Sequence, residues 1–141
     1  MNIVPATATQ ADLLAALDDS VAFSANWSAP NWHEELSRSA TRIWCAQEGE
    51  KLIGFIVLCG AAGQWEVLNL AVSAAYQRQG IATALMRHAL AAVNHAQVTL
   101  EVSTANQAAQ ALYNKMGFVI LGVRKKFYKD GTDALIMGNV L

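Results

Sequence analysis

The chain has 141 residues, of which 54% are hydrophobic and 15% charged, and its formal net charge is −1. This length suits one domain, so we expect a single domain over residues 1–141. The near-neutral charge argues against broad binding to nucleic acid, and no apolar run approaches the ~20 residues that span a membrane. The start of the chain, MNIVPATATQ, lacks a basic segment followed by an apolar block, so we expect no signal peptide and a cytoplasmic protein. Cys45 and Cys59 are isolated in apolar runs, which favours reduced core residues over a disulfide or a metal site.

Apolar periodicity and turn residues divide the chain into helices and strands. EGEK at 48–51 and Asp130-Gly131 are typical of hairpin turns, which predicts antiparallel pairing of the flanking strands. The expected elements, in chain order, are a strand at 2–6, helices at 9–23 and 26–36, strands at 41–47, 51–60 and 65–72, a helix at 79–94, a strand at 97–102, a helix at 106–116, and strands at 118–128 and 133–140.

Capping residues indicate where the first two helices begin. Thr9 and Asp12 stand three positions apart, as in a capping box with an aspartate variant, so the first helix is expected to begin there. Ser28 or Asn31 can cap the second helix, and Pro30 is tolerated in the first turn of a helix.

The middle of the chain predicts a βαβ unit with an anion site. The strands at 65–72 and 97–102 flank the helix at 79–94, so they should be parallel, whereas the hairpins make the sheet mixed overall. The turn before this helix exposes backbone N–H groups, whose partial positive charge favours an anion. Gly80 allows close approach of a ligand to the backbone, and Arg78 adds a positive charge.

A family resemblance makes this site specific. The run Gln77-Arg78-Gln79-Gly80-Ile81-Ala82 resembles the Q/R-x-x-G-x-G/A loop of the GNAT acetyltransferases, which cradles the pyrophosphate of acetyl-coenzyme A (acetyl-CoA). NLAVSAAYQRQGIATALM, LEVSTANQAAQALYNKMGF and the tail segments RKKFY and DALIM are similar to the RimI-type ribosomal-protein N-terminal acetyltransferases. These segments cover residues from about 66 to 137, and NWS at 26–28 resembles the Pro-Trp-Ser stretch of that family.

The resemblance implies an α/β GNAT fold, in which helices flank a mixed, mostly antiparallel sheet with a parallel βαβ acetyl-CoA site. It implies Glu101 as general base and Tyr113 as general acid, with acetyl-CoA as cosubstrate and no metal. The implied cofactor contacts are Leu70, Ala71 and Val72 to the pantetheine arm, Arg78, Gln79, Gly80, Ile81, Ala82 and Thr83 to the pyrophosphate, and Asn106 to the cofactor arm.

The residues themselves agree with these roles but leave alternatives open. In VTLEVS, Glu101 should face away from its apolar neighbours, and a carboxylate in such a strand is costly unless it is paired or functional. The alternative is an edge-strand glutamate that points to solvent. Tyr113 follows Asn106 by two helical turns, so both face the same side. A phenol with a pKa near 10 is a reasonable proton donor to a thiolate near 8.5, although a tyrosine packed in the core is the alternative.

The acceptor amine decides how strong the base must be. An α-amine has a pKa near 7.8 and a lysine amine near 10.4, so freeing the lysine costs about 3.5 kcal/mol more at neutral pH. One glutamate is therefore adequate for an α-amine. Glu66, on the strand before the loop, is a rival base or a substrate-binding residue, and its alternative is a solvent-facing position. The three histidines, His33, His88 and His95, are interpreted as surface or packing residues.

A small aromatic pocket is expected for the acceptor N-terminus. Trp27, Trp32 and Tyr128 are its candidates. In the family an aromatic pair near here holds the first residue of the peptide, and this chain has Phe127-Tyr128 where two tyrosines are more usual. The basic run at 124–126 is interpreted as a solvated strand face, not as a nucleic-acid site.

These observations predict direct acetyl transfer from acetyl-CoA to a protein N-terminal amine. The resemblance implies the N-terminal alanine of a small-subunit ribosomal protein as acceptor, and we expect a monomer or weak dimer without membrane or nucleic-acid partners. Neither cysteine lies in the matched catalytic segments, which favours a ternary complex over an acyl-enzyme. Two alternatives remain, a small-amine or antibiotic N-acetyltransferase on the same scaffold and a non-catalytic acyl-CoA-binding module.

Overall fold

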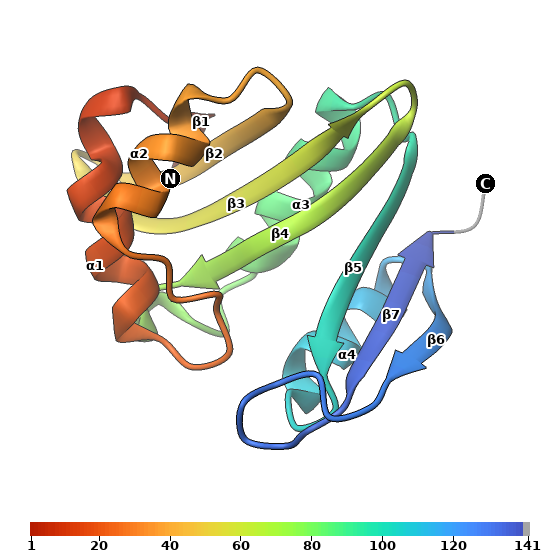
Figure 1. Cartoon of the computed structure of the whole chain (residues 1–141). Coiled ribbons are helices and arrows are strands. Elements are labelled where there is room, and N and C mark those ends of the chain that lie inside the picture. Colours follow the sequence, from red (N-terminus) through yellow and green to blue (C-terminus); the bar gives the residue numbers. More distant parts are fainter. Residues whose placement is uncertain (140–141) are drawn as a thin grey trace.

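The structure is a computed structural model that describes residues 1–139, so Val140, the last residue of the expected final strand, lies outside it. In this described part seven strands form one mixed sheet, in the order β1-β2-β3-β4-β5-β7-β6 (Figure 1). The elements are β1 (Asn2–Pro5), the 3₁₀ turn η1 (Ala8–Gln10), α1 (Ala11–Ser20), α2 (Ala29–Ser37), β2 (Thr41–Glu48), β3 (Lys51–Ala61), β4 (Gln64–Val72), the 3₁₀ turn η2 (Ala74–Tyr76), α3 (Ile81–Ala92), β5 (Gln97–Ser103), α4 (Gln107–Lys115), β6 (Phe118–Arg124) and β7 (Ala134–Asn139).

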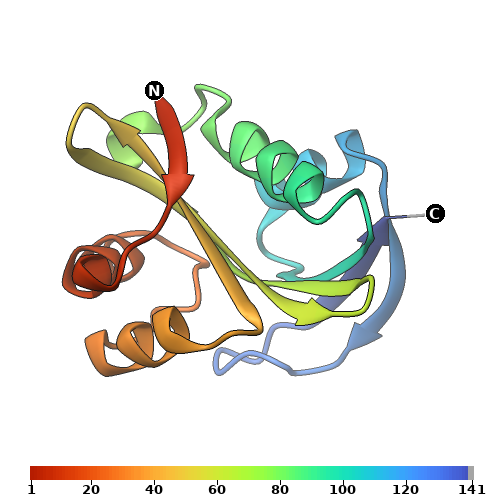
Figure 2. The same cartoon turned by 90° about the horizontal axis from the view of Figure 1, so that it is seen from above.

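Helices cover both faces of the sheet. α1 and α2 lie on one face, and α3 and α4 lie on the other (Figure 2). Successive residues of a strand point to opposite faces, so neighbouring residues of β3 serve different cores. Phe55 packs under Trp32 of α2, whereas Ile56 belongs to the cluster that contains Leu85 of α3 and Phe118. Within residues 1–139, no helix combines the length and the apolar character needed to cross a membrane.

Of the two predicted helix starts, one is wrong and one is confirmed. The expected capping box between Thr9 and Asp12 is wrong, because Thr7 and Gln10 form the capping box instead. The Thr7 N–H donates to Gln10 Oε1 over 2.8 Å, and a 3₁₀ turn then leads into α1. The second helix begins as expected, with Ser28 rather than Asn31 as its cap. Ser28 Oγ accepts the N–H of Asn31 over 3.3 Å.

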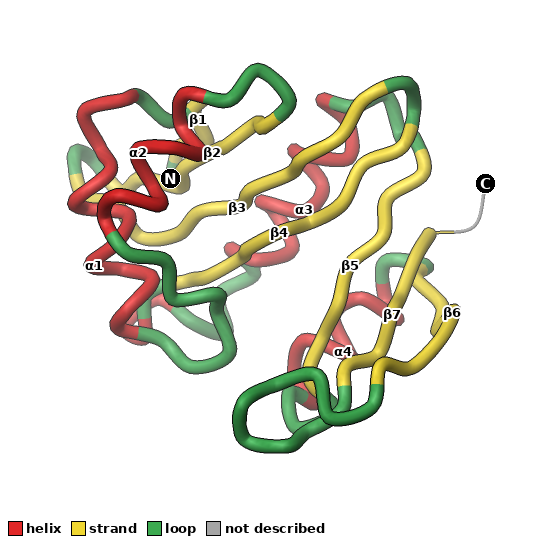
Figure 3. The backbone as a smooth tube through the Cα atoms, in the orientation of Figure 1, coloured by secondary structure: helices red, strands yellow, loops and turns green. Residues whose placement is uncertain are grey.

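The βαβ prediction is confirmed, since β4 and β5 pair in parallel and α3 connects them. The expected strand at 118–128 is too long. β6 ends at Arg124, and residues 125–133 form a loop before β7 (Figure 3). Lys126 has a φ of +51°, a left-handed conformation that cannot continue a strand, and its N–H is held by Asp133 Oδ1 at 2.9 Å.

Candidate active site

The two parallel strands separate halfway along their length. Pairing between β4 and β5 extends from Gln64 opposite Gln97 to Val67 opposite Leu100, and beyond that point the strands diverge (Figure 1). A cavity of about 850 Å³ opens where they part. The expected site residues that line it are Glu66, Leu70, Ala71, Val72, Arg78, Gly80, Ile81, Ala82, Thr83, Glu101, Asn106, Tyr113 and Tyr128.

A β-bulge in β4 is the structural cause of this divergence. Val57 of β3 pairs with Asn69 and Leu58 pairs with Val67, so Leu68 is an extra residue. A bulge bends its strand and strengthens the twist. The bend begins directly after Val67, the last residue that pairs with β5. β4 therefore turns away from β5 and leaves a free edge along the cavity.

The free edge of β4 offers peptide groups to a ligand. Ser73 donates its N–H to Ile53 of β3 over 2.8 Å. Because the peptide groups of a strand alternate between its two edges, those of Leu70 and Val72 face the gap toward β5. The Gln77 side chain donates to the Val72 carbonyl over 3.0 Å, which leaves the Val72 N–H available. An extended chain with amide groups can thus pair with this edge as an additional strand would.

The turn before α3 presents a run of free amides. The first hydrogen bond of the helix runs from the Ala84 N–H to the Gly80 carbonyl over 3.0 Å. Among the hydrogen bonds of the described residues, none uses an N–H of residues 78–83 as donor. Gly80 has a φ of +81° and Arg78 a φ of +64°, so the turn curls its amides toward one side. Six consecutive free amides at the positive end of a helix dipole are suited to a diphosphate.

Glu101 lies on the sheet face opposite its buried neighbours Leu100 and Val102, as the alternation predicted. Its carboxylate Oε1 is 3.2 Å from Nε of Arg124, and its side chain is only 20% exposed. The basic run at 124–126 is therefore not simply a solvated face, because Arg124 is the ion-pair partner of Glu101. Sequence reasoning missed this pairing, since the strands of the two residues, β5 and β6, are not adjacent in the sheet: β7 lies between them.

Glu66 is exposed and lines the same cavity. Partial burial, and next the charge of Glu101, raise the pKa of the Glu66 carboxyl, while Arg124 partly offsets this rise. Burial and then Glu101 also raise the pKa of Tyr128. Glu66, Glu101 and Tyr128, which line the cavity, and Arg124 beside them therefore form one group of interacting ionisable side chains.

Tyr113 also lines the cavity. The residue is 7% exposed and its ring packs 6.0 Å from the ring of Phe118, and among residues 1–139 no hydrogen bond of its hydroxyl is found. Burial, and next Tyr128, raise the pKa of Tyr113 to about 12, well above the value near 10 expected from the sequence. The phenol thus keeps its proton throughout the neutral range.

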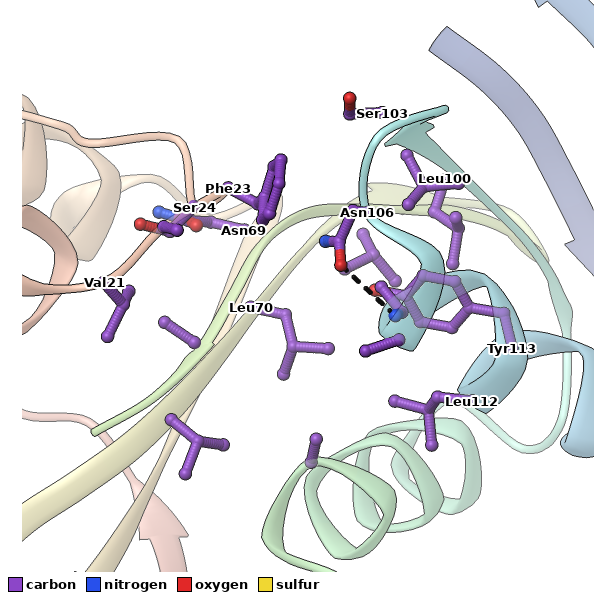
Figure 4. Close-up of a pocket in the computed structure, with 18 of the residues that line it drawn as sticks. Val21, Phe23, Ser24, Asn69, Leu70, Leu100, Ser103, Asn106, Leu112 and Tyr113 are labelled. Atoms are coloured by element: carbon purple, nitrogen blue, oxygen red, sulfur yellow. Dashed lines mark hydrogen bonds between the residues drawn. The ribbon is translucent and has the colours of Figure 1, made fainter. Parts of the chain in front are cut away.

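Asn106 stands above Tyr113 on the same wall (Figure 4). Its Oδ1 accepts the Ala109 N–H over 3.3 Å and caps α4, so its Nδ2 remains free to donate. Phe23, Ser24 and Asn69 lie across the cavity from it in the same view.

Some expected site residues do not line the cavity. Gln79 contributes only to the turn, and Trp27 is absent from the lining in the part of the chain described. Trp27 packs instead at 4.9 Å on Trp32, which is fully buried against Phe55. The expected pocket of Trp27, Trp32 and Tyr128 is therefore wrong as regards Trp32. No histidine of residues 1–139 lines the cavity either, and His88 packs on Trp44.

Sequence reasoning also missed the segment Val21–Ala25 and Asn69, which line the cavity, and the buried Asp18 behind them. One signal was present: Asp18 falls on the same helical face as Leu14 and Leu17, where a carboxylate must find partners.

The diverging parallel strands, the free edge of β4 and the amide-rich turn before α3 together form the candidate cofactor site. The chain matches the model of the acetyltransferase (GNAT) family over residues 12–118. The chain therefore belongs to the GNAT acetyltransferases, and the expected fold is confirmed.

Relatives narrow the class to N-acyltransferases. The chain is 33% identical over 116 residues to the N-alpha-acetyltransferase RimI of Mycobacterium tuberculosis, which covers 79% of this chain and 73% of that protein. It is 32% identical over 117 residues to the ribosomal protein bS18-alanine N-acetyltransferase of Escherichia coli, with coverage of 79% and 78%. The crystal structure of the ribosomal-protein-S18-alanine N-acetyltransferase from Escherichia coli matches with a TM-score of 0.88 at 25% identity, over 98% of this chain and 92% of that one.

Proposed function

We propose that this acetyltransferase uses acetyl-CoA to acetylate a protein N-terminal amine, in particular the N-terminal alanine of a small-subunit ribosomal protein. The observation that carries the proposal is that Glu101, paired with Arg124, and the protonated Tyr113 line the same cavity. The names of the relatives in Mycobacterium tuberculosis and Escherichia coli support the choice of an α-amine.

The residues present fit acetyl-CoA. The free amides of residues 78–83 suit its pyrophosphate, and the free edge at Leu70 and Val72 suits the amides of its pantetheine arm. When bound, acetyl-CoA supplies an activated acetyl group on a thioester. With the arm along β4, the Nδ2 of Asn106 is free to donate to it from the opposite wall.

Glu101 is proposed to take the proton from the acceptor. An α-amine with a pKa near 7.8 is about one-seventh neutral at pH 7, and this neutral form can attack. A carboxylate then suffices to take the proton that the amine nitrogen releases as the new C–N bond forms. Arg124 pairs with the Glu101 carboxylate and holds it in place. Glu66 lies in the same group of charges, so it either binds the incoming ammonium or shares the role of base.

Two donors are proposed for the charge that develops during transfer. The Val72 N–H faces the gap and would donate to the thioester carbonyl oxygen. Tyr113 would donate its hydroxyl hydrogen to the leaving sulfur. Its pKa of about 12 makes complete transfer to a free thiolate near 8.5 unfavourable, so Tyr113 acts first as a hydrogen-bond donor. Burial also disfavours the thiolate anion and so raises the pKa of the departing thiol, which brings it closer to the pKa of Tyr113.

A panel of acceptors tests this function. The purified protein is assayed with a peptide that begins with alanine, the same peptide with a formylated N-terminus and an internal lysine, and spermidine. Release of coenzyme A and the mass of each product are measured. The expected result is one acetyl group on the free α-amine and none on the blocked peptide. Acetylation of lysine or spermidine with the free α-amine left unmodified would contradict the proposal.

A further inference from the structure

Asp18 is a buried carboxylate that no step of the proposed reaction uses. It is 0% exposed and, within residues 1–139, has no cationic partner. Its oxygens accept four N–H groups, those of Asn26 (2.8 Å), Trp27 (2.7 Å), the Trp32 indole (3.2 Å) and Asn69 Nδ2 (3.0 Å). A buried charge with four donors is an anchor, because each donor would lose its partner in the low-dielectric interior if the carboxylate were removed.

Asn69 extends this anchor to β4. Its Oδ1 accepts the Ala25 N–H over 3.0 Å while its Nδ2 donates to Asp18. Asn69 directly follows the bulged Leu68. Paired residues of adjacent strands share a face, so pairing with Val57 places Asn69 on the α1 side of the sheet, where Asp18 lies. The bulge that opens the cavity is thus hydrogen-bonded to the segment after α1.

The segment held in this way is the wall opposite Asn106 and Tyr113 (Figure 4). Phe23 lines the cavity, is 59% exposed and has a φ of +68°, which is rare for a bulky residue. Packing of the Phe23 side chain therefore does not fix its position. Hydrogen bonds of the following residues fix it instead. Ser24 Oγ donates to the Asp18 carbonyl over 2.8 Å, the Ala25 N–H donates to Asn69, and the Asn26 N–H donates to the Asp18 carboxylate.

We propose that Asp18, acting through Asn69, is a positioning residue for the acceptor: it holds Val21–Asn26 against the bulge of β4 so that Phe23 forms the surface on which the first peptide residues pack. This inference rests on the proposed peptide acceptor. A wall that is already ordered spares the peptide the entropic cost of ordering it on binding. The anchor therefore acts on peptide affinity, whereas the pyrophosphate site at residues 78–83 lies on another part of the chain.

Kinetics of Asp18→Asn, with Asp19→Asn as matched control, test the inference. Asparagine keeps the size but replaces one acceptor oxygen by a donor that faces N–H groups. We expect KM for the alanine peptide to rise by about tenfold or more, while KM for acetyl-CoA and kcat at saturating peptide stay within about twofold. Asp19 is exposed on the same helix, so Asp19→Asn should behave as wild type. An unchanged peptide KM, or an equal loss for both substrates, would overturn the inference.

Exchange of amide protons, measured by NMR without any acceptor, gives a second readout. In wild type the N–H groups of Asn26 and Trp27 should be protected, and Asp18→Asn should remove that protection while Leu85 in α3 keeps its own. If Asp18→Asn does not fold, Asn69→Ala and Phe23→Ala take its place, with the same expected selectivity for peptide KM. Failure of wild type to acetylate any free N-terminus would refute the proposed function, whereas normal peptide KM in these variants would refute this inference alone.

Discussion

Arg124 reaches Glu101 across an intervening strand. Glu101 of β5 lies opposite Ile136 of β7, and Ile136 lies opposite Gly122 of β6. Arg124 is two positions beyond Gly122 and so emerges on the same face, from where its Nε approaches Glu101 Oε1 to 3.2 Å. The proposed base is thus held in place by the folded sheet before any acceptor is present.

The role of Glu101 predicts a large loss of turnover in Glu101→Gln. The amide keeps the shape but cannot take a proton, so kcat should fall by about 10² to 10⁴-fold while affinity for acetyl-CoA changes little. Steady-state kinetics and calorimetric titration with acetyl-CoA measure the two effects. Glu50→Gln, at an exposed turn, is the control and should retain full activity. Normal kcat in Glu101→Gln would point to Glu66 as the base.

Arg124→Gln is expected to move the acid limb of kcat/KM to higher pH. Arg124 lowers the pKa of Glu66, so its removal makes protonation of the Glu66 carboxylate easier, and it also removes the ion-pair partner of Glu101. Because Arg124 is 57% exposed and screened by solvent, the displacement should be small and should shrink at high salt. Lys125→Gln removes the same charge at an exposed neighbour and should leave the profile unchanged. A displacement toward lower pH would be inconsistent with this role.

Glu66→Gln should gain stability relative to wild type as pH rises. The folded protein raises the pKa of Glu66 above its ordinary 4.5, so the folded state favours the protonated form. Its contribution to stability is full below the unfolded pKa and is lost as pH rises through the folded one. Glutamine resembles the protonated form at every pH. Urea denaturation of both proteins between about pH 4 and pH 7 measures the difference, which should grow with pH. A constant or shrinking difference would count against the raised pKa.

Tyr113→Phe separates the hydroxyl from the packing of the ring. The variant keeps the contact with Phe118, so it should fold normally, while kcat falls by about 10²-fold. Ultraviolet titration should show that the wild-type protein has a tyrosine that ionises near pH 12 and that the variant lacks this step. An unchanged kcat would exclude donation to the leaving sulfur.

Gly80→Ala and Gly63→Ala form a matched pair. The two glycines have φ angles of +81° and +82°, and a Cβ at either position meets nothing within 4 Å. Each substitution should therefore cost a similar ~1–2 kcal/mol of stability through backbone strain alone. The new methyl at 80 lies in the turn proposed for the pyrophosphate, so affinity for acetyl-CoA should fall about tenfold or more in Gly80→Ala alone. Equal affinity in both variants would argue against this turn as the pyrophosphate site.

Features with local causes were predictable from the sequence. The βαβ order, the hairpin turns, the Ser28 cap and the outward face of Glu101 all follow from residues within a few positions of one another. The glycine before α3 likewise indicated the turn, because a left-handed φ there suits few other residues. The exception is the start of the first helix, where Thr7 and Gln10 form the capping box, two residues before the predicted pair Thr9 and Asp12.

Only the tertiary structure decided how these parts form a site. The bulge at Leu68, the partnership of Glu101 with Arg124, the raised pKa of Tyr113 and the four bonds to Asp18 each join segments distant in the chain. Periodicity reports which face a residue occupies, but the register between strands and the packing of loops decide what that face meets. For that reason the sequence alone indicated the cofactor-binding turn and the carboxylate of Glu101, whereas the wall at Val21–Asn26 opposite Tyr113 could be recognised only in the folded structure.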